Sequence, residues 1–394
     1  MSDRVRGLDG LRALAVIAVM LFHSDLGWAR GGFLGVDLFF VVSGFIITTL
    51  LLREQTDTGR IGLRAFYVRR ARRLLPALAL VAAATIIVAG LAATDAAADV
   101  RADLPWAAGF LLNWHYIAAD HSYFATMARP PLLQHLWSLA IEEQFYIVWP
   151  ALLIALSRLR SSLFTSRHLI AAVSLGGAAL SALQMATLAD RLGVPITADP
   201  MRVYFGTDTH AFGLLIGCAL AALRPPTGKG FAAAAHDPSR LIRVTGYAAL
   251  GAAITAMALL DGSTGWLYRG GMPGFALAVA AVIGVASRPG FATVLTWRPI
   301  EWVGQRSYGM YLWHWPVFTL LRPGVDTAWP DPVVHGVRWT IVIGISALSY
   351  RLVEQPLRSG TFRWPAYEPR RAAAAALTLS LLASGAARKH GRVE

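Results

Sequence analysis

The chain has 394 residues, of which 56% are hydrophobic and 15% are charged, against about 25% charged residues in an ordinary soluble domain. This composition excludes most soluble classes and disorder, and the single cysteine, Cys218, excludes a disulfide framework and a cysteine metal cluster. The net charge of +13 does not indicate nucleic-acid binding, because the basic residues lie in short stretches between long apolar runs, as in the loops of a membrane protein.

Membrane spans are predicted where apolar runs approach the roughly 20 residues that cross the hydrocarbon core. In chain order they are 8–26, 35–52, 76–93, 137–156, 168–187, 209–223, 243–260, 272–287, 307–321, 336–353 and, more weakly, 372–387. The first run contains Asp9, Arg12 and His23 and has no small-residue cleavage site. We therefore expect a retained helix there rather than a signal peptide.

The distribution of arginine and lysine predicts the orientation. The stretches 53–75, 157–167, 224–243, 288–306 and 351–371 hold 7, 3, 4, 3 and 5 of these residues. Such loops are cytoplasmic, so the N-terminus is predicted to be cytoplasmic and the protein to lie in the inner (cytoplasmic) membrane. An even number of spans must then separate successive basic loops.

That parity decides the ambiguous stretch 104–119, which is apolar enough to look like a helix. Counting it as a span would break the parity, so it is predicted to be an outer interfacial or re-entrant segment. Its Trp106, Trp114 and Tyr116 suit the membrane interface. The predicted fold is all-α, with about ten transmembrane helices and a weaker eleventh candidate. Residues 1–358 would form one membrane domain, and 359–394 a cytoplasmic segment, the eleventh candidate and a short outer tail.

Ionisable residues inside the first span are the first functional candidates, since such groups are costly in a membrane. Arg12 and His23 are 11 residues apart, almost three helical turns, so they share one face and lie about 16 Å apart along the axis. Asp9 precedes Arg12 by about one turn and can pair with it. The alternative is that Arg12 snorkels to the interface and His23 is a satisfied interior histidine.

Arginines precede the third span in the stretch FYVRRARRLLP. Guanidinium groups bind phosphate through paired hydrogen bonds, and in a helix Arg69 and Arg72, like Arg70 and Arg73, would form i,i+3 pairs. The stretch is therefore either a phosphate clamp or simply the positive-inside signal.

Two adjacent glutamates, Glu142 and Glu143, lie early in the fourth span, in HLWSLAIEEQFY, which enters the membrane from the outer side. Adjacent residues on a helix point about 100° apart, so at most one of them faces a given site. Ser138 and Glu142 are i,i+4 and share a face. One glutamate can instead stabilise the helix N-terminus.

Further candidates are weaker. His314 lies among aromatic residues in SYGMYLWHWP, three residues after Tyr311, a pattern that also fits plain packing. Asp37 stands in GVDLFFVVSGF. No Walker motif, zinc signature or dinucleotide-binding loop occurs in the sequence, so no metal and no bound cofactor are predicted.

Together these features describe a relay across the membrane. A phosphate-bearing donor would dock at the cytoplasmic arginines, its reactive end would reach His23, and an acceptor would approach from outside near Glu142. A coenzyme A thioester has the required shape, with an anionic nucleotide, a thin arm and an acyl group at its tip. Histidine suits the role of general base for a hydroxyl that attacks a thioester, and an acyl-histidine relay is an alternative.

The chain resembles the acyltransferase 3 family of integral membrane O-acyltransferases, from about residue 5 to 358. GLDGLRALAV followed by His23 is similar to the family's arginine–histidine signature, which places it on Arg12 and His23. GVDLFFVVSGFIIT, YVRRARRLLP, HLWSLAIEEQFYIVWP, SYGMYLWHWPV and SYRLVEQPLR resemble further family segments, in the family's order. Asp208-Thr209-His210 departs from the Arg-Ala-Asp common in relatives, so no role is assigned there.

The resemblance implies transfer of an acyl group, usually acetyl, from cytoplasmic acyl-CoA to a hydroxyl of an extracytoplasmic acceptor. The acceptor would be a glycan, a lipid-linked saccharide or a small hydroxylated molecule. His23 and Glu142 would be catalytic, and Arg12 and the four arginines would bind the donor. Asp9, Asp37, Ser138, Tyr311 and His314 would support the site.

A competing hypothesis is a transporter that moves an acylated or saccharide cargo without chemistry. Transporters often show internal repeats with broken helices in matching halves, and no such pairing is found in the sequence.

Overall fold

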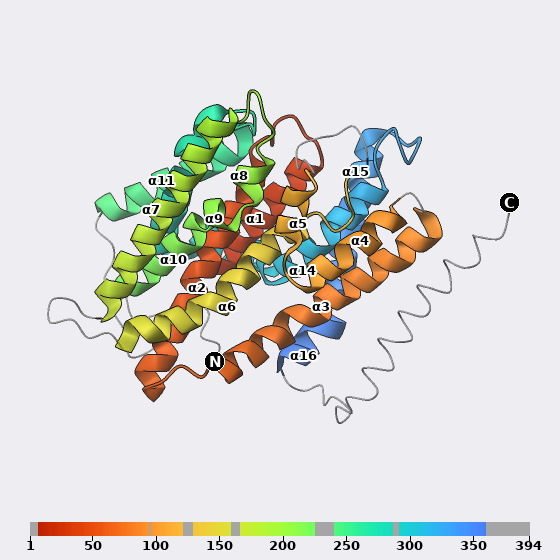
Figure 1. The fold of residues 1–394 in the computed structure, drawn as a ribbon. Helices are drawn as coiled ribbons and strands as arrows, with labels where there is room; N and C mark the ends of the chain where they lie inside the picture. Colours follow the sequence, from red (N-terminus) through yellow and green to blue (C-terminus); the bar gives the residue numbers. More distant parts are fainter. Residues whose placement is uncertain are drawn as a thin grey trace.

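The computed structural model describes residues 7–93, 96–120, 129–158, 166–224, 240–286 and 291–359. This part of the chain is helical and contains no β-strand beyond an isolated bridge between Pro323 and Thr327 (Figure 1). The weak eleventh span, 372–387, and almost all of the predicted C-terminal segment lie outside these residues.

Each of the ten stronger predicted spans overlaps a helix. These are α1 Leu8–His23, α2 Gly35–Thr58, α3 Leu63–Ala92, α6 Leu136–Arg158, α7 Ser166–Leu192, α10 Phe212–Leu223, α11 Arg240–Leu259, α12 Gly271–Ala286, α14 Arg298–Leu320 and α15 Asp331–Ser349. Within the described residues, six helical segments are long and apolar enough to cross a membrane: 32–58, 63–91, 136–158, 166–192, 240–259 and 331–358. The protein therefore has several candidate membrane helices, and the count of ten stays a prediction.

Shorter elements connect these helices. They are α4 Ala97–Ala108, α5 Leu112–Ala118, α8 Met201–Phe205, α9 Thr207–His210, α13 Ala292–Leu295, α16 Gln355–Ser359, the 3-10 turns Gly32–Leu34 and Gly265–Arg269, and a π-helical turn Tyr350–Glu354. As expected, the stretch 104–119 is not one long helix. It is divided between α4 and α5, and Phe110 between them has a positive φ of 55°.

Helix α3 begins at Leu63, 13 residues before the predicted start at residue 76. A hydropathy scan misses this first part because five arginines lie in it, although arginine is a good helix former. Pro76 lies inside the helix without ending it. The arginine stretch is therefore helical, which is the condition for its i,i+3 pairs.

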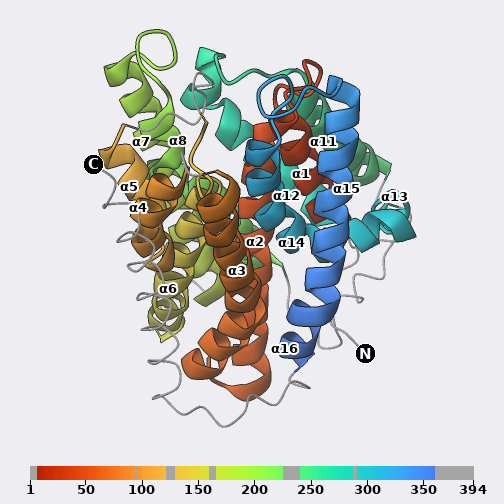
Figure 2. The same cartoon turned by 90° about the vertical axis from the view of Figure 1, so that its right-hand side faces the viewer.

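Helix α1 lies at the centre of the bundle and packs against α2 and α14 (Figure 2). Leu11, Val16 and Val19 on α1 are almost completely buried. The helix that carries Arg12 and His23 thus runs through the protein interior, and the two side chains face other helices rather than lipid.

Helices α2 and α10 approach closely at glycines. A Cβ atom on Gly44 would lie 1.9 Å from the carbonyl oxygen of Leu214, and one on Gly217 would lie 2.1 Å from that of Val41. Both contacts are with backbone atoms, which cannot move aside without separating the helices. Only glycine fits at these two positions.

We expect Gly44→Ala to destabilise the protein by about 1–3 kcal/mol, the usual cost of overpacking. Gly274→Ala is the matched control, because Gly274 lies on α12 with no atom within 4 Å of a Cβ placed there. The measurement is the midpoint of thermal unfolding in detergent. Equal midpoints for the two variants would contradict the close packing of α2 on α10.

Candidate active site

A narrow cavity of about 80 Å³ lies beside α1 and is here called the arginine cavity. Its polar lining comes from Arg12, Ser43, Arg70, Arg73, Ser138, Glu142, Tyr146, Ser307, Tyr308 and Tyr311, on α1, α2, α3, α6 and α14. Arg12 also forms an ion pair with Asp9 at 3.8 Å, as its spacing predicts. A cavity of this volume is too small for a nucleotide.

The structure separates the four arginines of α3 into two pairs. Arg70 and Arg73 line the cavity. Arg69 is at the surface and donates to Glu54 at 2.9 Å, and Arg72 is exposed. The cause is helical phase: each i,i+3 pair shares a face, and only one of the two faces is turned toward the cavity.

The two cavity arginines differ in their partners. Arg70 donates to Glu143 at 2.9 and 3.2 Å and lies over the Tyr146 ring, 3.2 Å from its centre. Arg73 makes no ion pair or hydrogen bond with any residue that the structure describes. Arg73 is therefore the cavity guanidinium that is available for an anionic or carbonyl-bearing ligand.

Glu142 lies in the arginine cavity and accepts a hydrogen bond from the Ser43 hydroxyl at 2.7 Å. Ser138 lines the same cavity, which confirms that these two residues of α6 share a face. The approach of an acceptor to Glu142 from the outer side stays a prediction. Glu142 lies six residues into α6, about 9 Å from the start of that helix, where it meets the arginines.

Histidines from three parts of the chain meet at the end of α1. His23 Nδ1 lies 3.0 Å from His314 Nε2, and His314 Nδ1 lies 2.5 Å from the carbonyl oxygen of Tyr311. The ring of His135 is 5.8 Å from that of His314. His135 was not singled out from the sequence, although it opens the segment that contains Ser138 and Glu142.

Tyr311 connects this cluster to the arginine cavity. Its hydroxyl lies 2.7 Å from the Ser138 hydroxyl and donates to the carbonyl oxygen of His135 at 2.9 Å. Tyr311, Ser138 and His314, predicted as supporting residues, therefore form one chain of contacts that reaches His23 through His314.

A second, larger cavity of about 1000 Å³ has His23 and Trp315 in its wall and is here called the histidine cavity. The rest of its described lining comes from Pro130 and from segments 22–25, 195–200, 261–263, 318–325 and 331–338. Among the residues that the structure describes, none lines both cavities. Helix α1 thus presents Arg12 to one cavity and His23 to the other.

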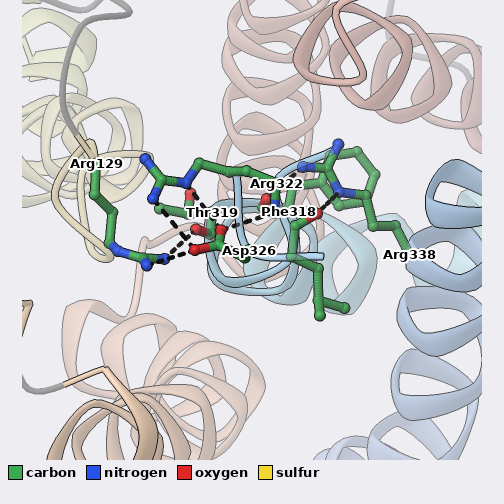
Figure 3. A network of polar contacts seen from close by, with 7 residues as sticks. Arg129, Phe318, Thr319, Arg322, Asp326 and Arg338 are labelled. Carbon is green, nitrogen blue, oxygen red and sulfur yellow. Dashed lines mark hydrogen bonds and ion pairs between the residues drawn. The ribbon is translucent and has the colours of Figure 1, made fainter. Parts of the chain in front are cut away.

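An arginine network borders the histidine cavity (Figure 3). Asp326 accepts hydrogen bonds from Arg129 at 2.8 Å and from Arg322 at 2.9 Å. Arg338 donates to the carbonyl oxygens of Phe318 and Leu321. Arg338 thus ties α15 to the C-terminal end of α14, and Asp326 ties the loop after α14 to Arg129. These contacts fix this part of the cavity wall.

Asp326 lies in that loop, and its pKa reflects the network. Burial raises the pKa of this carboxyl, but hydrogen bonds from Arg322 and Arg129 outweigh burial and lower it to about 2. The depressed pKa means that the network stabilises the fold above the unfolded-state pKa of about 4 and loses this contribution as the pH falls toward 2.

Asp326→Asn should therefore destabilise the protein by about 1–2 kcal/mol at neutral pH. The difference from wild type in the midpoint of thermal unfolding should stay constant between pH 5 and 8. It should shrink as the pH falls below 4. A difference that grows on acidification would contradict the assigned role of the carboxylate.

Two other polar pairs lie away from the histidine cluster. His210 Nε2 and Asp37 Oδ1 are 2.9 Å apart, and both side chains are fully buried. Asp208 pairs with Arg202 at 2.8 Å. Asp37, predicted as a supporting site residue, lines neither cavity. Within the described ranges, no group of three or more His, Cys, Asp or Glu side chains is placed to hold a metal ion.

The family model described as an acyltransferase domain, Acyl_transf_3, matches residues 5–350. The chain belongs to this acyltransferase family. The resemblance drawn from the six sequence segments is thereby confirmed.

Similar proteins within the family come from several bacteria. The protein YrhL of Bacillus subtilis is 39% identical over 363 residues, covering 91% of this chain and 56% of YrhL. The peptidoglycan O-acetyltransferase OatA of Listeria monocytogenes is 36% identical, with 91% and 56% covered. The O-acetyltransferase OatA of Staphylococcus aureus is 33% identical, with 95% and 61% covered.

The chain therefore spans less than two thirds of the length of these relatives. No solved structure matches it significantly.

Proposed function

We propose that this protein is a membrane O-acyltransferase that moves an acetyl group from acetyl-CoA to a hydroxyl of a glycan. The observation that carries the proposal is the course of α1 between two cavities, with Arg12 in one and His23 in the other. The names of the relatives support acetyl as the group and peptidoglycan as the class of acceptor.

The arginine cavity is the proposed site for the acyl-bearing arm of the donor. Arg12, Arg70 and Arg73 supply the positive charge that phosphate and carbonyl oxygens require. Because the cavity is narrow, the nucleotide stays outside it and only the thin arm enters. Arg69 and Arg72 face away from the cavity. Arg69 is paired with Glu54, whereas the exposed Arg72 can meet the nucleotide at the surface. Glu142 offsets part of the arginine charge and is proposed to position these side chains.

The histidine cavity is the proposed acceptor site. Its volume of about 1000 Å³ suits a saccharide, and Asp25, Asp261 and Asp331 in its wall can accept hydrogen bonds from hydroxyl groups. Trp315 and Phe318 provide apolar surface beside His23. The predicted orientation puts this cavity on the outer side of the inner membrane and the N-terminus in the cytoplasm.

The proposed chemistry begins with His23 as general base. His23 takes the proton of the acceptor hydroxyl, whose oxygen attacks the thioester carbon. The carbon–sulfur bond then breaks, and His23 returns the proton to the leaving thiolate. In the alternative, a nitrogen of His23 attacks the thioester carbon, the carbon–sulfur bond breaks, and the thiolate takes the imidazole proton and leaves as CoA. The acceptor hydroxyl then attacks the acetyl carbon, and its proton returns to His23 as the acetyl–nitrogen bond breaks. In both, the thioester reaches His23 past the Ser138–Tyr311 pair.

Mass spectrometry of peptidoglycan fragments from cells with and without the protein tests the function. We expect O-acetylated fragments, heavier by the mass of an added acetyl group, only in cells that make the wild-type protein. Identical fragment masses in both would rule out peptidoglycan as the acceptor. If purified protein also releases no CoA from acetyl-CoA with any hydroxylated acceptor, the acyltransferase proposal fails.

A further inference from the structure

The hydrogen bonds of His314 determine which of its nitrogens carries a proton. Nδ1 lies 2.5 Å from the carbonyl oxygen of Tyr311. A carbonyl oxygen only accepts hydrogen bonds, so Nδ1 is the donor and carries the hydrogen. In neutral imidazole the other nitrogen then holds a lone pair. Nε2 of His314 is therefore an acceptor.

This acceptor is directed at His23. His314 Nε2 and His23 Nδ1 are 3.0 Å apart, and the two rings are stacked with their centres 5.1 Å apart. A hydrogen bond between two nitrogens needs one donor, and His314 Nε2 cannot supply it in the neutral form. His23 Nδ1 is therefore protonated, and the lone pair of neutral His23 is on Nε2.

A doubly protonated His314 would reverse this assignment, but its surroundings disfavour a cation. His314 is fully buried, and within the described part of the chain its ring contacts are with Tyr311, His23, His135, Trp315 and Phe318, none of them acidic. A buried cation without a counter-charge is strongly unfavourable. His135 does not compete for the hydrogen bond, since neither of its ring nitrogens makes one within ordinary geometric limits.

Trp315 holds the His23 ring from another side. The two ring centres are 4.6 Å apart at an interplanar angle of 71°, and the indole nitrogen donates to the carbonyl oxygen of Pro131. Two neighbours in sequence, His314 and Trp315, thus fix the orientation of His23.

We infer that His314 is a positioning residue that holds His23 in the Nδ1-protonated tautomer, so that Nε2 is the nitrogen that reacts. The inference rests on the proposed function, and it applies both to general-base catalysis and to an acyl-histidine. When Nε2 takes the hydroxyl proton, the hydrogen bond from Nδ1 to His314 becomes charge-assisted and stronger. His314 thus has the orienting role that a carboxylate has in a serine–histidine–aspartate triad, without its charge.

Two variants of His314 separate tautomer control from packing. His314→Gln keeps an acceptor, the amide oxygen, at the position of Nε2, whereas His314→Phe keeps a ring without an acceptor. We expect H314F to lower kcat by about 100-fold to 10,000-fold. The lower figure is typical when a residue that orients a site ligand is lost, and the upper figure is typical when a triad histidine is held in the wrong tautomer. The KM for acetyl-CoA should change by less than about twofold. H314Q should recover kcat to within about 10-fold of wild type.

Equal losses of kcat in H314Q and H314F, or wild-type kcat in H314F, would overturn the inference. Acyl transfer by the wild-type protein together with such results would leave the proposed function intact, whereas an inactive wild type would refute the function itself. Nitrogen-15 NMR of the wild-type protein, with His23 assigned through His23→Ala, decides the point even if H314F does not fold. The expected spectrum shows Nδ1 protonated, and a protonated Nε2 would contradict the inference.

Discussion

His23→Ala is expected to lower the rate of acetyl transfer by about 1,000-fold or more. The proposed base, or nucleophile, is then absent, and histidine general bases typically contribute 100-fold to 10,000-fold. His23 is also the imidazole that lines the histidine cavity and contacts His314. The measurement is release of CoA from acetyl-CoA by purified protein in the presence of a glycan acceptor.

His168→Ala is the matched control, since His168 is an exposed residue of α7 that lines neither cavity. It should retain wild-type kcat. Both variants should unfold near the wild-type temperature, so that the lost activity is not caused by lost structure. Full transfer by folded H23A would exclude His23 as base and as nucleophile.

Arg73→Gln is expected to raise the KM for acetyl-CoA by about 10-fold to 100-fold. A hydrogen bond to a charged group contributes about 1.5–3 kcal/mol. Arg73 lines the cavity and makes no hydrogen bond or ion pair with a described residue, so its guanidinium can bind the donor without first breaking another contact. Because the interaction is made equally with donor and transition state, kcat should change by less than about threefold. Initial rates over a range of acetyl-CoA concentrations give both constants.

Arg69→Gln provides the control within the same helix. Arg69 carries the same charge one turn earlier but pairs with Glu54 at the surface. Its KM for acetyl-CoA should stay within about threefold of wild type. A larger KM increase in R69Q than in R73Q would show that the donor binds outside the arginine cavity.

The periodicity of apolar residues was sufficient to predict much of the helical framework. The phase of Arg12 and His23 on one helix follows from their spacing, and α1 carries both as predicted. Parity of the basic loops excluded a span at 104–119, where α4 and α5 form two short helices. The start of α3 was missed because charged arginines lower the hydropathy of a segment without ending its helix.

The rotation of each helix about its axis could not be predicted. From the sequence, either arginine pair on α3 could face the site. Only the position of α3 beside the cavity-lining residues of α1, α6 and α14 shows that Arg70 and Arg73 face the cavity. The same limit applies to Glu142. Its spacing from Ser138 predicts a shared face, but only the packing of the helices shows that this face meets the arginines. Helix rotation depends on contacts between segments distant in sequence.

The histidine contacts are a second feature beyond sequence reasoning. His23 and His314 are separated by 291 residues, and Asp37 and His210 by 173. Nothing in the local pattern distinguishes the pair beside the cavity from the fully buried one. Only the way α1 packs against α14, and the place of each pair relative to the cavities, separates them.

Transfer of radiolabelled acetyl groups in proteoliposomes is the decisive measurement. Membrane-impermeant acetyl-CoA is supplied on one face and peptidoglycan oligosaccharides on the other, with the orientation of the protein determined by protease cleavage. We predict labelled oligosaccharide and free CoA only when acetyl-CoA is on the face of the N-terminus, and neither product with H23A. Movement of label across the membrane without release of CoA would instead show a transporter and contradict the proposed acyl transfer.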